Sequence, residues 1–175
     1  NGFTVDYMMA VDTDGALSNT SSQMAIGMGG MGSFHINNKF GSKANGIDDV
    51  MPVAYNETWD GLSPDNPSFF GSSTTNGSVD YRIPAVEMAG MTINASYTYD
   101  PSAGAAPAGK GAVATTSVDG DAVTVQIAHE SGVSIGGGIE NVNDSQGKTL
   151  GSDTSNQTGY ITYSNGPLTV GYQEA

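Results

Sequence analysis

The sequence predicts an all-β protein whose strands form an antiparallel up-and-down sheet. Apolar and polar residues alternate with a period of two in successive short segments, as expected for strands with one apolar and one polar face. Gly, Asn, Asp and Ser, the residues that turns favour, separate these segments. Short and long connections also alternate along the chain, so a meander would gather its tight turns at one end and its long loops at the other.

Nine strands are predicted in this way. They cover residues 3–11, 23–28, 33–39, 79–83, 91–99, 122–128, 133–140, 160–164 and 168–173. The clearest is 91–99, where Met, Ile, Ala and Tyr alternate with Thr, Asn and Ser. Tight turns are expected near Gly30, residues 88–90, Gly132 and Gly166, and Pro84 ends the fourth strand or places it at an edge. The long loops are predicted over residues 12–22, 40–78, 100–120 and 141–156.

An acidic stretch at residues 42–62 interrupts the alternation. Apolar residues recur there at roughly helical spacing, namely Ile47, Val50, Met51, Ala54 and, after a gap, Trp59. A short helix or helical turn is therefore predicted, and Pro52 prevents a long one. The stretch carries four carboxylates, with Lys43 as its one cation. In an otherwise all-strand chain we expect such an insertion either to cover another part of the protein or to line a space within it. The alternative is a solvated surface loop, because loops normally lie on the surface.

The composition excludes several classes of function. The 175 residues are enough for one domain, and they include 5 Lys and Arg against 18 Asp and Glu, a formal charge of −13. That balance argues against nucleic acid as a partner, because phosphate binding needs a basic face. The chain has no Cys and 2 His, which excludes thiolate metal sites and argues against a His-rich zinc site.

The strand pattern does not decide whether the apolar face is buried in a core or faces the lipid of a membrane. No window holds the roughly 18 consecutive apolar residues of a membrane helix, whereas barrel strands are only about 9–11 residues long and alternate. A buried core and a lipid-facing band give the same alternation along one strand. Tyr97, Tyr99, Phe3 and Tyr172 lie near strand ends, a placement typical of aromatic girdles at a membrane interface.

Three parts of the chain carry a resemblance to a known family. They are the hairpin at 24–39 (MAIGMGGMGSFHINNK), the acidic loop entered through Ile-Asp-Asp-Val at 47–50, and the two strands within 79–100 (VDYRIPAVEMAGMTINASYTYD). Together they resemble the third-loop region of the general diffusion porins of the Gram-negative outer membrane. The resemblance implies a transmembrane β-barrel, contact with outer-membrane lipid, a homotrimer, and passive diffusion of ions and small hydrophilic solutes without catalysis.

The same resemblance implies where a pore would be narrowed. The insertion at 42–78 would fold inward as a constriction loop. Charged groups facing one another across a narrow wet gap create a transverse field that sorts solutes by charge and dipole. The acidic side would consist of Asp48, Asp49, Glu57 and Asp60, and parity along the strands places His35, Lys39 and Arg82 on the opposing wall. The net charge indicates a mild preference for cations.

The sequence also departs from that family. The wall has only Lys39 and Arg82 as basic candidates, and residues 173–175 lack a terminal aromatic. Nine strands are too few for a barrel of about 16, and an open sheet edge cannot face lipid. The chain also begins at Asn1 without Met. We therefore expect residues 1–175 to be an internal segment, about half of a single larger barrel domain.

Two other classes of function compete with the channel. An enzyme is not expected, because no Gly-x-Ser-x-Gly, Walker loop or Cys/His pairing is present, and the adjacent Asp48 and Asp49 do not form a spaced acid/base pair. A soluble or cell-surface acidic β-domain, such as an adhesin or surface-layer binding module, would share the composition. It would bury its apolar face, whereas a porin would show that face to lipid.

No cofactor is expected, with one alternative left open. The segments Asp12-Thr13-Asp14-Gly15 and Asp119-Gly120-Asp121 lack the ligand spacing of a calcium loop and are predicted to be hairpin turns. The carboxylates of the acidic loop are hard oxygen ligands of the kind that Ca²⁺ prefers.

Overall fold

The described residues form ten strands and two short 3₁₀ helices. The structure, a computed structural model, describes residues 2–12, 18–38, 41–52, 77–101, 118–144 and 153–174. The strands are β1 (Thr4–Asp12), β2 (Ser18–Gly27), β3 (Ser33–Asn38), β4 (Val79–Arg82), β5 (Val86–Met88), β6 (Met91–Asp100), β7 (Val118–His129), β8 (Val133–Asp144), β9 (Thr154–Asn165) and β10 (Leu168–Glu174), and the helices are η1 (Gly29–Met31) and η2 (Asn45–Val50). The predicted all-β class is confirmed. The described residues contain no helix long and apolar enough to cross a membrane.

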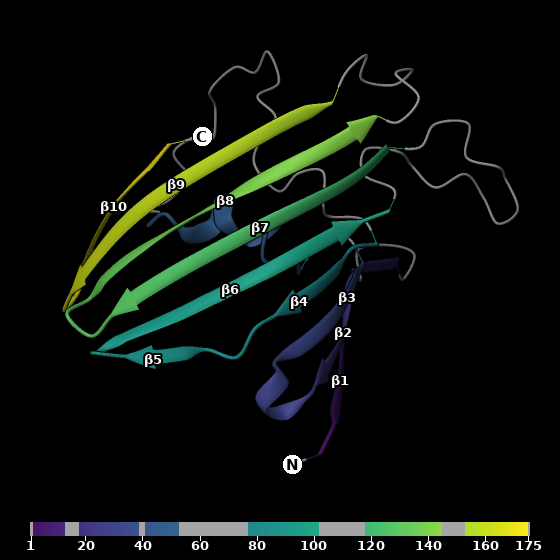
Figure 1. Ribbon diagram of the computed structural model, residues 1–175, viewed down its shortest axis with the longest axis horizontal. Helices are drawn as coiled ribbons and strands as arrows, with labels where there is room; N and C mark the ends of the chain where they lie inside the picture. The colour runs from purple at the N-terminus through teal and green to yellow at the C-terminus, as the bar shows by residue number, and fades with distance from the viewer. Residues whose placement is uncertain are drawn as a thin grey trace, which may run out of the picture.

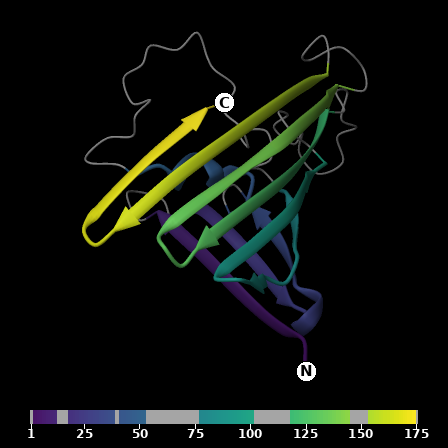
Figure 2. The same ribbon diagram turned by 60° about the vertical axis from the view of Figure 1, so that its left-hand side comes forward.

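The strands form one antiparallel up-and-down sheet. Its order is β1-β2-β3-β4-β6-β7-β8-β9-β10, so neighbours along the chain are neighbours in space, and β5 pairs with β6 beside this path. Figures 1 and 2 show that the sheet is curved and that η2 lies on one side of it, behind β8 in Figure 1. Within the described residues β1 pairs only with β2 and β10 only with β9, so the sheet is not closed into a barrel.

Pro84 accounts for the difference between nine predicted strands and ten observed ones. β4 and β5 both pair with β6, and the amide of Ile83 between them still donates to the Ala95 carbonyl at 3.1 Å. Proline has no N–H to donate, so the ladder is interrupted there. The sheet is therefore nine strands wide, as predicted, with one strand divided in two.

Three predicted loops were too long. β7 begins at Val118, inside the loop expected over 100–120, so Asp119-Gly120-Asp121 lies in a strand and the hairpin turn predicted there is wrong. β2 begins at Ser18, inside the loop expected over 12–22, and β8 and β9 extend to Asp144 and back to Thr154, inside the loop expected over 141–156. The added segments of β2, β8 and β9 are rich in Ser, Asn and Thr, which favour turns when considered alone. In the sheet they are held by the ladder itself, for example in the pair Asn141–Ser155.

The predicted separation of short and long connections is confirmed. η1, the turn at Ala89 and Gly90, residues 130–132 and residues 166–167 join strand ends at one side of the sheet, and the strand ends that border the longer connections lie at the opposite side (Figure 2). Gly132 shows why glycine is needed in these turns. Its φ is +90°, and a Cβ there would collide with the Ser164 carbonyl oxygen.

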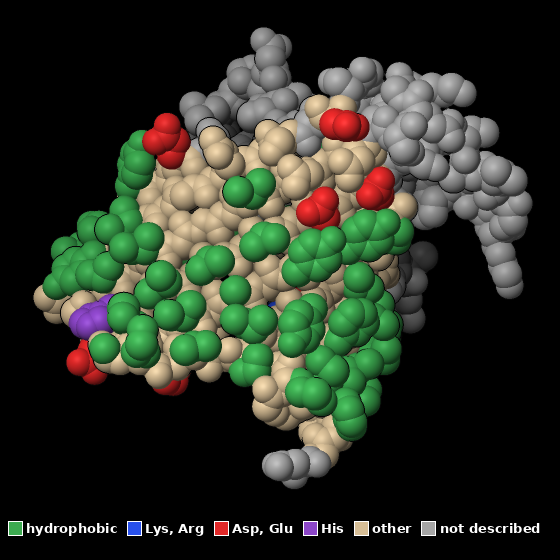
Figure 3. Space-filling view, viewed as in Figure 1, with side chains coloured by type: hydrophobic (Ala, Val, Ile, Leu, Met, Phe, Trp, Pro, Cys, Tyr) green, Lys and Arg blue, Asp and Glu red, His purple; other side chains and the backbone are tan. Residues whose placement is uncertain are grey.

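The two faces of the sheet have an unusual polarity. We call the face that carries Asp80 and Thr98, against which residues 41–52 pack, the inner face. Both of these side chains are fully buried, as is Glu140 on the same face. The outer face carries the large apolar residues, and they are exposed: Val123 is 48 % and Ile139 55 % accessible. Figure 3 shows hydrophobic side chains spread across this outer face.

The first prediction concerns the turn between β7 and β8. We expect Gly132→Ala to lower the free energy of unfolding by about 3 kcal/mol, since it combines a left-handed conformation with a backbone collision. Gly166→Ala is the matched control, because its φ is +57° but its Cβ would meet open space, and it should cost only about 1 kcal/mol. Equilibrium urea unfolding followed by circular dichroism measures both, and equal losses would contradict the role assigned to the collision.

Candidate functional site

Residues 41–52, which we call the inserted stretch, begin at a cluster of hydrogen bonds on the inner face. The Gly41 carbonyl accepts from Gln23 Nε2 at 3.0 Å and from Arg82 Nη2 at 2.8 Å. Two residues further on, the Lys43 amide donates to Asp80 Oδ2 at 3.0 Å. β2 and β4 thus hold the start of the inserted stretch through three hydrogen bonds to its backbone.

Asp80 is the centre of this cluster. Its Oδ2 also accepts from Arg82 Nη2 at 2.9 Å, and its Oδ1 accepts from the Thr98 hydroxyl. Asp80 itself is fully buried, and a buried carboxylate is costly unless donors and an opposite charge compensate it. Three donors from three different segments do so here, and this ties β4, β6 and the inserted stretch together.

The inserted stretch then crosses the inner face. Ala44 and Ile47 are buried against Ala122 of β7 and Tyr160 of β9. The Ile47 carbonyl accepts from Gln173 Nε2 of β10 at 3.3 Å. The inserted stretch therefore reaches from β4 to β10, at the far side of the sheet.

The inserted stretch is helical only briefly. η2 is a 3₁₀ helix, and Met51 after it is extended with ψ of 140°. A residue that precedes proline is pushed out of the helical region, so Pro52 ends the helix. Met51 and Pro52 lie against Gly171 of β10, since a Cβ on that glycine would be 3.0 Å from each of them. The predicted short helical turn is confirmed.

Two of the predicted wall residues can be placed. His35 lies on the inner face of β3, 8 % exposed, with Nε2 2.8 Å from the Ser33 hydroxyl, and Asp80 is its cross-strand partner. Arg82 also lies on the inner face. Its Nη2 contacts Asp80 and Gly41, so this cation anchors the inserted stretch.

The remaining predicted site residues are not brought into contact by the described structure. The backbone of Asp48 and Asp49 forms part of η2, and their side chains are not among those described. Glu57, Asp60 and Lys39 lie outside the described residues. The opposition of these charges across a gap stays a prediction, and so does a Ca²⁺ ion in the acidic loop. In the part of the chain that is described, no group of three or more metal-ligating side chains is present.

Sequence reasoning did not single out Asp80, the residue that organises the site. The available signal was its parity, because Asp80 shares a strand face with Arg82 two residues away. Its role depends on Lys43 and Thr98, which are 37 and 18 residues distant in the chain.

A cavity of about 180 Å³ lies between the inserted stretch and the wall of β6 and β7. Its polar lining comprises Lys43, Arg82, Asn94, Ser96, Thr124 and Gln126, with Tyr160 at the β9 side. Partial desolvation and, second, the positive charge of Arg82 lower the pKa of Lys43, and Asp80 opposes both effects. The lining offers hydrogen bonds and two cationic groups, which suits polar solutes in water.

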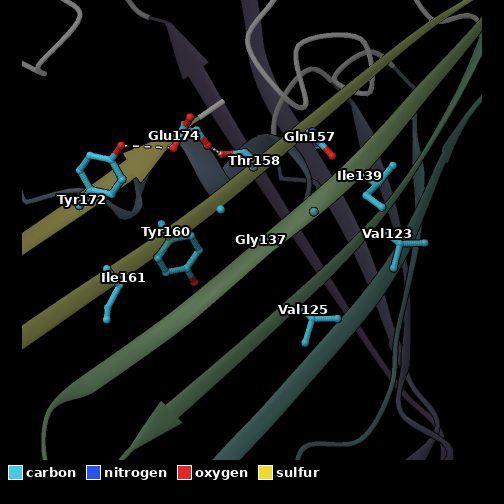
Figure 4. A pocket seen from close by; sticks show the side chains of 12 residues that line it. Val123, Val125, Gly137, Ile139, Gln157, Thr158, Tyr160, Ile161, Tyr172 and Glu174 are labelled. Carbon is cyan, nitrogen blue, oxygen red and sulfur yellow. Dashed lines mark hydrogen bonds between the residues drawn. The ribbon is translucent and has the colours of Figure 1, made fainter.

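A second hollow, of about 700 Å³, lies on the outer face. Gly137 and Gly159 pair across β8 and β9 and leave an apolar surface without side chains, bordered by Val123, Ile139 and Ile161 (Figure 4). At its edge the Tyr172 hydroxyl donates to Glu174 Oε2 at 3.3 Å. The apolar lining contributes no chemistry, so this hollow belongs to the outer surface and not to the polar site.

Comparisons of the chain with protein-family models, with curated proteins and with solved structures gave no match. The polar inner face and the inserted stretch therefore define the candidate site through their geometry alone.

The second prediction tests the anchor at Asp80. Asp80→Asn keeps the shape but replaces an acceptor oxygen with an NH₂ group that must face another donor. We expect the free energy of unfolding to fall by about 1–3 kcal/mol and trypsin to cleave faster after Lys43. Asp121→Asn, on the outer face of β7, is the matched control. Limited proteolysis with mass spectrometry of the fragments measures this, and unchanged cleavage after Lys43 would contradict the anchor.

Proposed function

We propose that this chain forms part of the wall of an outer-membrane diffusion channel of the general porin type. The channel would pass ions and small hydrophilic solutes, without a chemical reaction. The chain would contribute about half of a transmembrane β-barrel of about 16 strands, in the outer membrane of a Gram-negative bacterium. The resemblance in residues 24–100 adds a homotrimer to this proposal.

The observation that carries the proposal is the inverted polarity of the sheet. A β-domain in water buries its apolar face and wets its polar face. Here Asp80, Thr98 and Glu140 are buried while the isoleucines and valines of the outer face are exposed. Covering one Val or Ile side chain is worth about 1.5–3 kcal/mol, so an apolar face of this extent favours contact with lipid over contact with water.

The open edges support closure by further strands. β1 and β10 each leave one row of backbone N–H and C=O groups unpaired within the described sheet. In hydrocarbon each unsatisfied group costs several kcal/mol, so a lipid-facing sheet must close into a barrel. Additional strands that join β1 and β10 would complete the wall.

The inserted stretch supports a constriction. It crosses the inner face from Asp80 to Gln173 and narrows the space that a barrel would enclose. The predicted field across the pore would come from Asp48, Asp49, Glu57 and Asp60 opposite the wall cations.

The third prediction tests which face meets lipid. Val125→Lys places a charge on the outer face, and in the middle of a membrane band it should cost about 2–4 kcal/mol of folding free energy in lipid vesicles. Ala128→Lys is the matched control on the inner face of the same strand, outside the lining of the cavity beside the inserted stretch, and it should be tolerated.

An acidic surface module gives the opposite result. There Val125→Lys would be a surface substitution with an effect within about 0.5 kcal/mol, and the protein would stay in solution without detergent. The intact mass of the native polypeptide, extracted in detergent, adds a second test, because a full barrel needs a mass near twice 17.9 kDa.

The fourth prediction concerns the acidic side of the constriction. Neutralising Asp48 and Asp49 together (Asp48→Asn and Asp49→Asn) should reduce the preference for K⁺ over Cl⁻, because it removes negative charge from the narrowest part of the pore. Glu130→Gln, at the short turn after β7, is the control. Reversal potentials in planar bilayers measure the ratio, and an unchanged ratio would remove these residues from the constriction.

A further inference from the structure

One cross-strand row of the inner face lies beneath the far half of the inserted stretch. The pairing of the strands links its members in order: Asn94, Gln126, Gly136, Tyr160 and Gln173. Four of them are large polar or aromatic residues, and Gly136, in the centre, has no side chain. The row is thus hollow at Gly136 on β8, between two strands with bulky residues.

The ring of Tyr160 occupies the space above Gly136. A Cβ built on Gly136 would lie 2.6 Å from both Cε1 and Cζ of that ring, closer than real Cβ contacts come. Figure 4 shows the ring reaching from β9 towards β8. The hydroxyl end of the Tyr160 ring therefore lies over the backbone of β8 at Gly136, and a side chain at position 136 would displace it.

The inserted stretch rests on the other side of this ring. Ile47 and Ala44 pack with Tyr160 in the one buried apolar cluster of the described inner face, and Tyr160 is 6 % exposed. The neighbouring Gln173 fixes the Ile47 carbonyl. The ring also borders the cavity of about 180 Å³ beside the inserted stretch. It is therefore a spacer between the wall and the inserted stretch.

We propose that Tyr160, seated on Gly136, sets the height of the inserted stretch above the wall and thereby the size limit of the passage. Tyr160 is a positioning residue, and Gly136 determines the depth at which it sits. This inference rests on the proposed channel function and deepens it, because it assigns the selection of solutes by size to an uncharged pair separate from the charged residues of the constriction.

The experiment uses the native polypeptide in planar bilayers. Gly136→Ala adds one methyl group and no charge, and it lifts the ring into the passage. Single-channel conductance should fall and smaller polyethylene glycols should be excluded, while the ratio of K⁺ to Cl⁻ permeability stays at the wild-type value. Gly159→Ala is the matched control on β9, since its Cβ would meet only one atom, at 4.0 Å, and it should leave all three readouts unchanged.

Substitutions of Tyr160 separate the spacer from general packing. Tyr160→Ala should admit larger polyethylene glycols, and Tyr160→Phe, which keeps the ring, should retain the wild-type limit. In the Tyr160→Ala background, Gly136→Ala should have no further effect, because its action passes through the ring. If Gly136→Ala fails to fold, the comparison of Tyr160→Ala with Tyr160→Phe still tests whether the ring sets the size limit.

Each outcome has a distinct meaning. Wild-type conduction with an unchanged size limit in Gly136→Ala and Tyr160→Ala would overturn this inference alone. An effect of Gly136→Ala that persists without the ring would overturn it as well. Absence of conduction by the wild-type polypeptide would overturn the proposed function, and this inference with it.

Discussion

The two-residue period of the strands imposes the constraint on which this structure depends. Successive side chains point to opposite faces, and in this sequence apolar residues alternate with polar ones, so the strands with an apolar outer face place polar groups on the inner one. Once the inserted stretch covers that face, these groups lose water and need partners. Asp80 meets this requirement through Lys43, Arg82 and Thr98. The polarity of the two faces and the anchoring of the inserted stretch at Asp80 thus both depend on the alternation of apolar and polar side chains along the strands.

Under the proposed function, charge and size would be handled by different parts of the inner face. The cluster around Asp80 holds the start of the inserted stretch near two cations, Arg82 and Lys43. The far part rests on Tyr160 and Gln173, which bring no net charge. Under the proposed function, a solute would meet a charged boundary on the β4 side and an aromatic spacer on the β9 side. Changes at Gly136 could then alter size selection without altering ion preference.

Glycine has separate roles in the turns, the inner face and the outer face. At Gly132 it permits a left-handed turn beside a backbone oxygen, and at Gly136 it gives room to an aromatic ring. On the outer face, Gly137 and Gly159 leave an apolar hollow where neighbouring strands carry Val and Ile. A high glycine content in the sequence indicates turns, but it does not separate these three cases, because they differ in backbone conformation and in what the missing Cβ would have met.

The sequence by itself determined the all-β class, the meander order, the strand faces and the short helical turn before Pro52, because all of these follow from local periodicity and turn chemistry. Parity also placed His35 and Arg82 on the inner face. Only the tertiary structure decided that Asp80 anchors the inserted stretch, that β8 and β9 continue through Asn- and Ser-rich segments, and that Tyr160 lies over Gly136. Each of these depends on contacts between strands, and one strand read alone carries no information about what its neighbour places opposite.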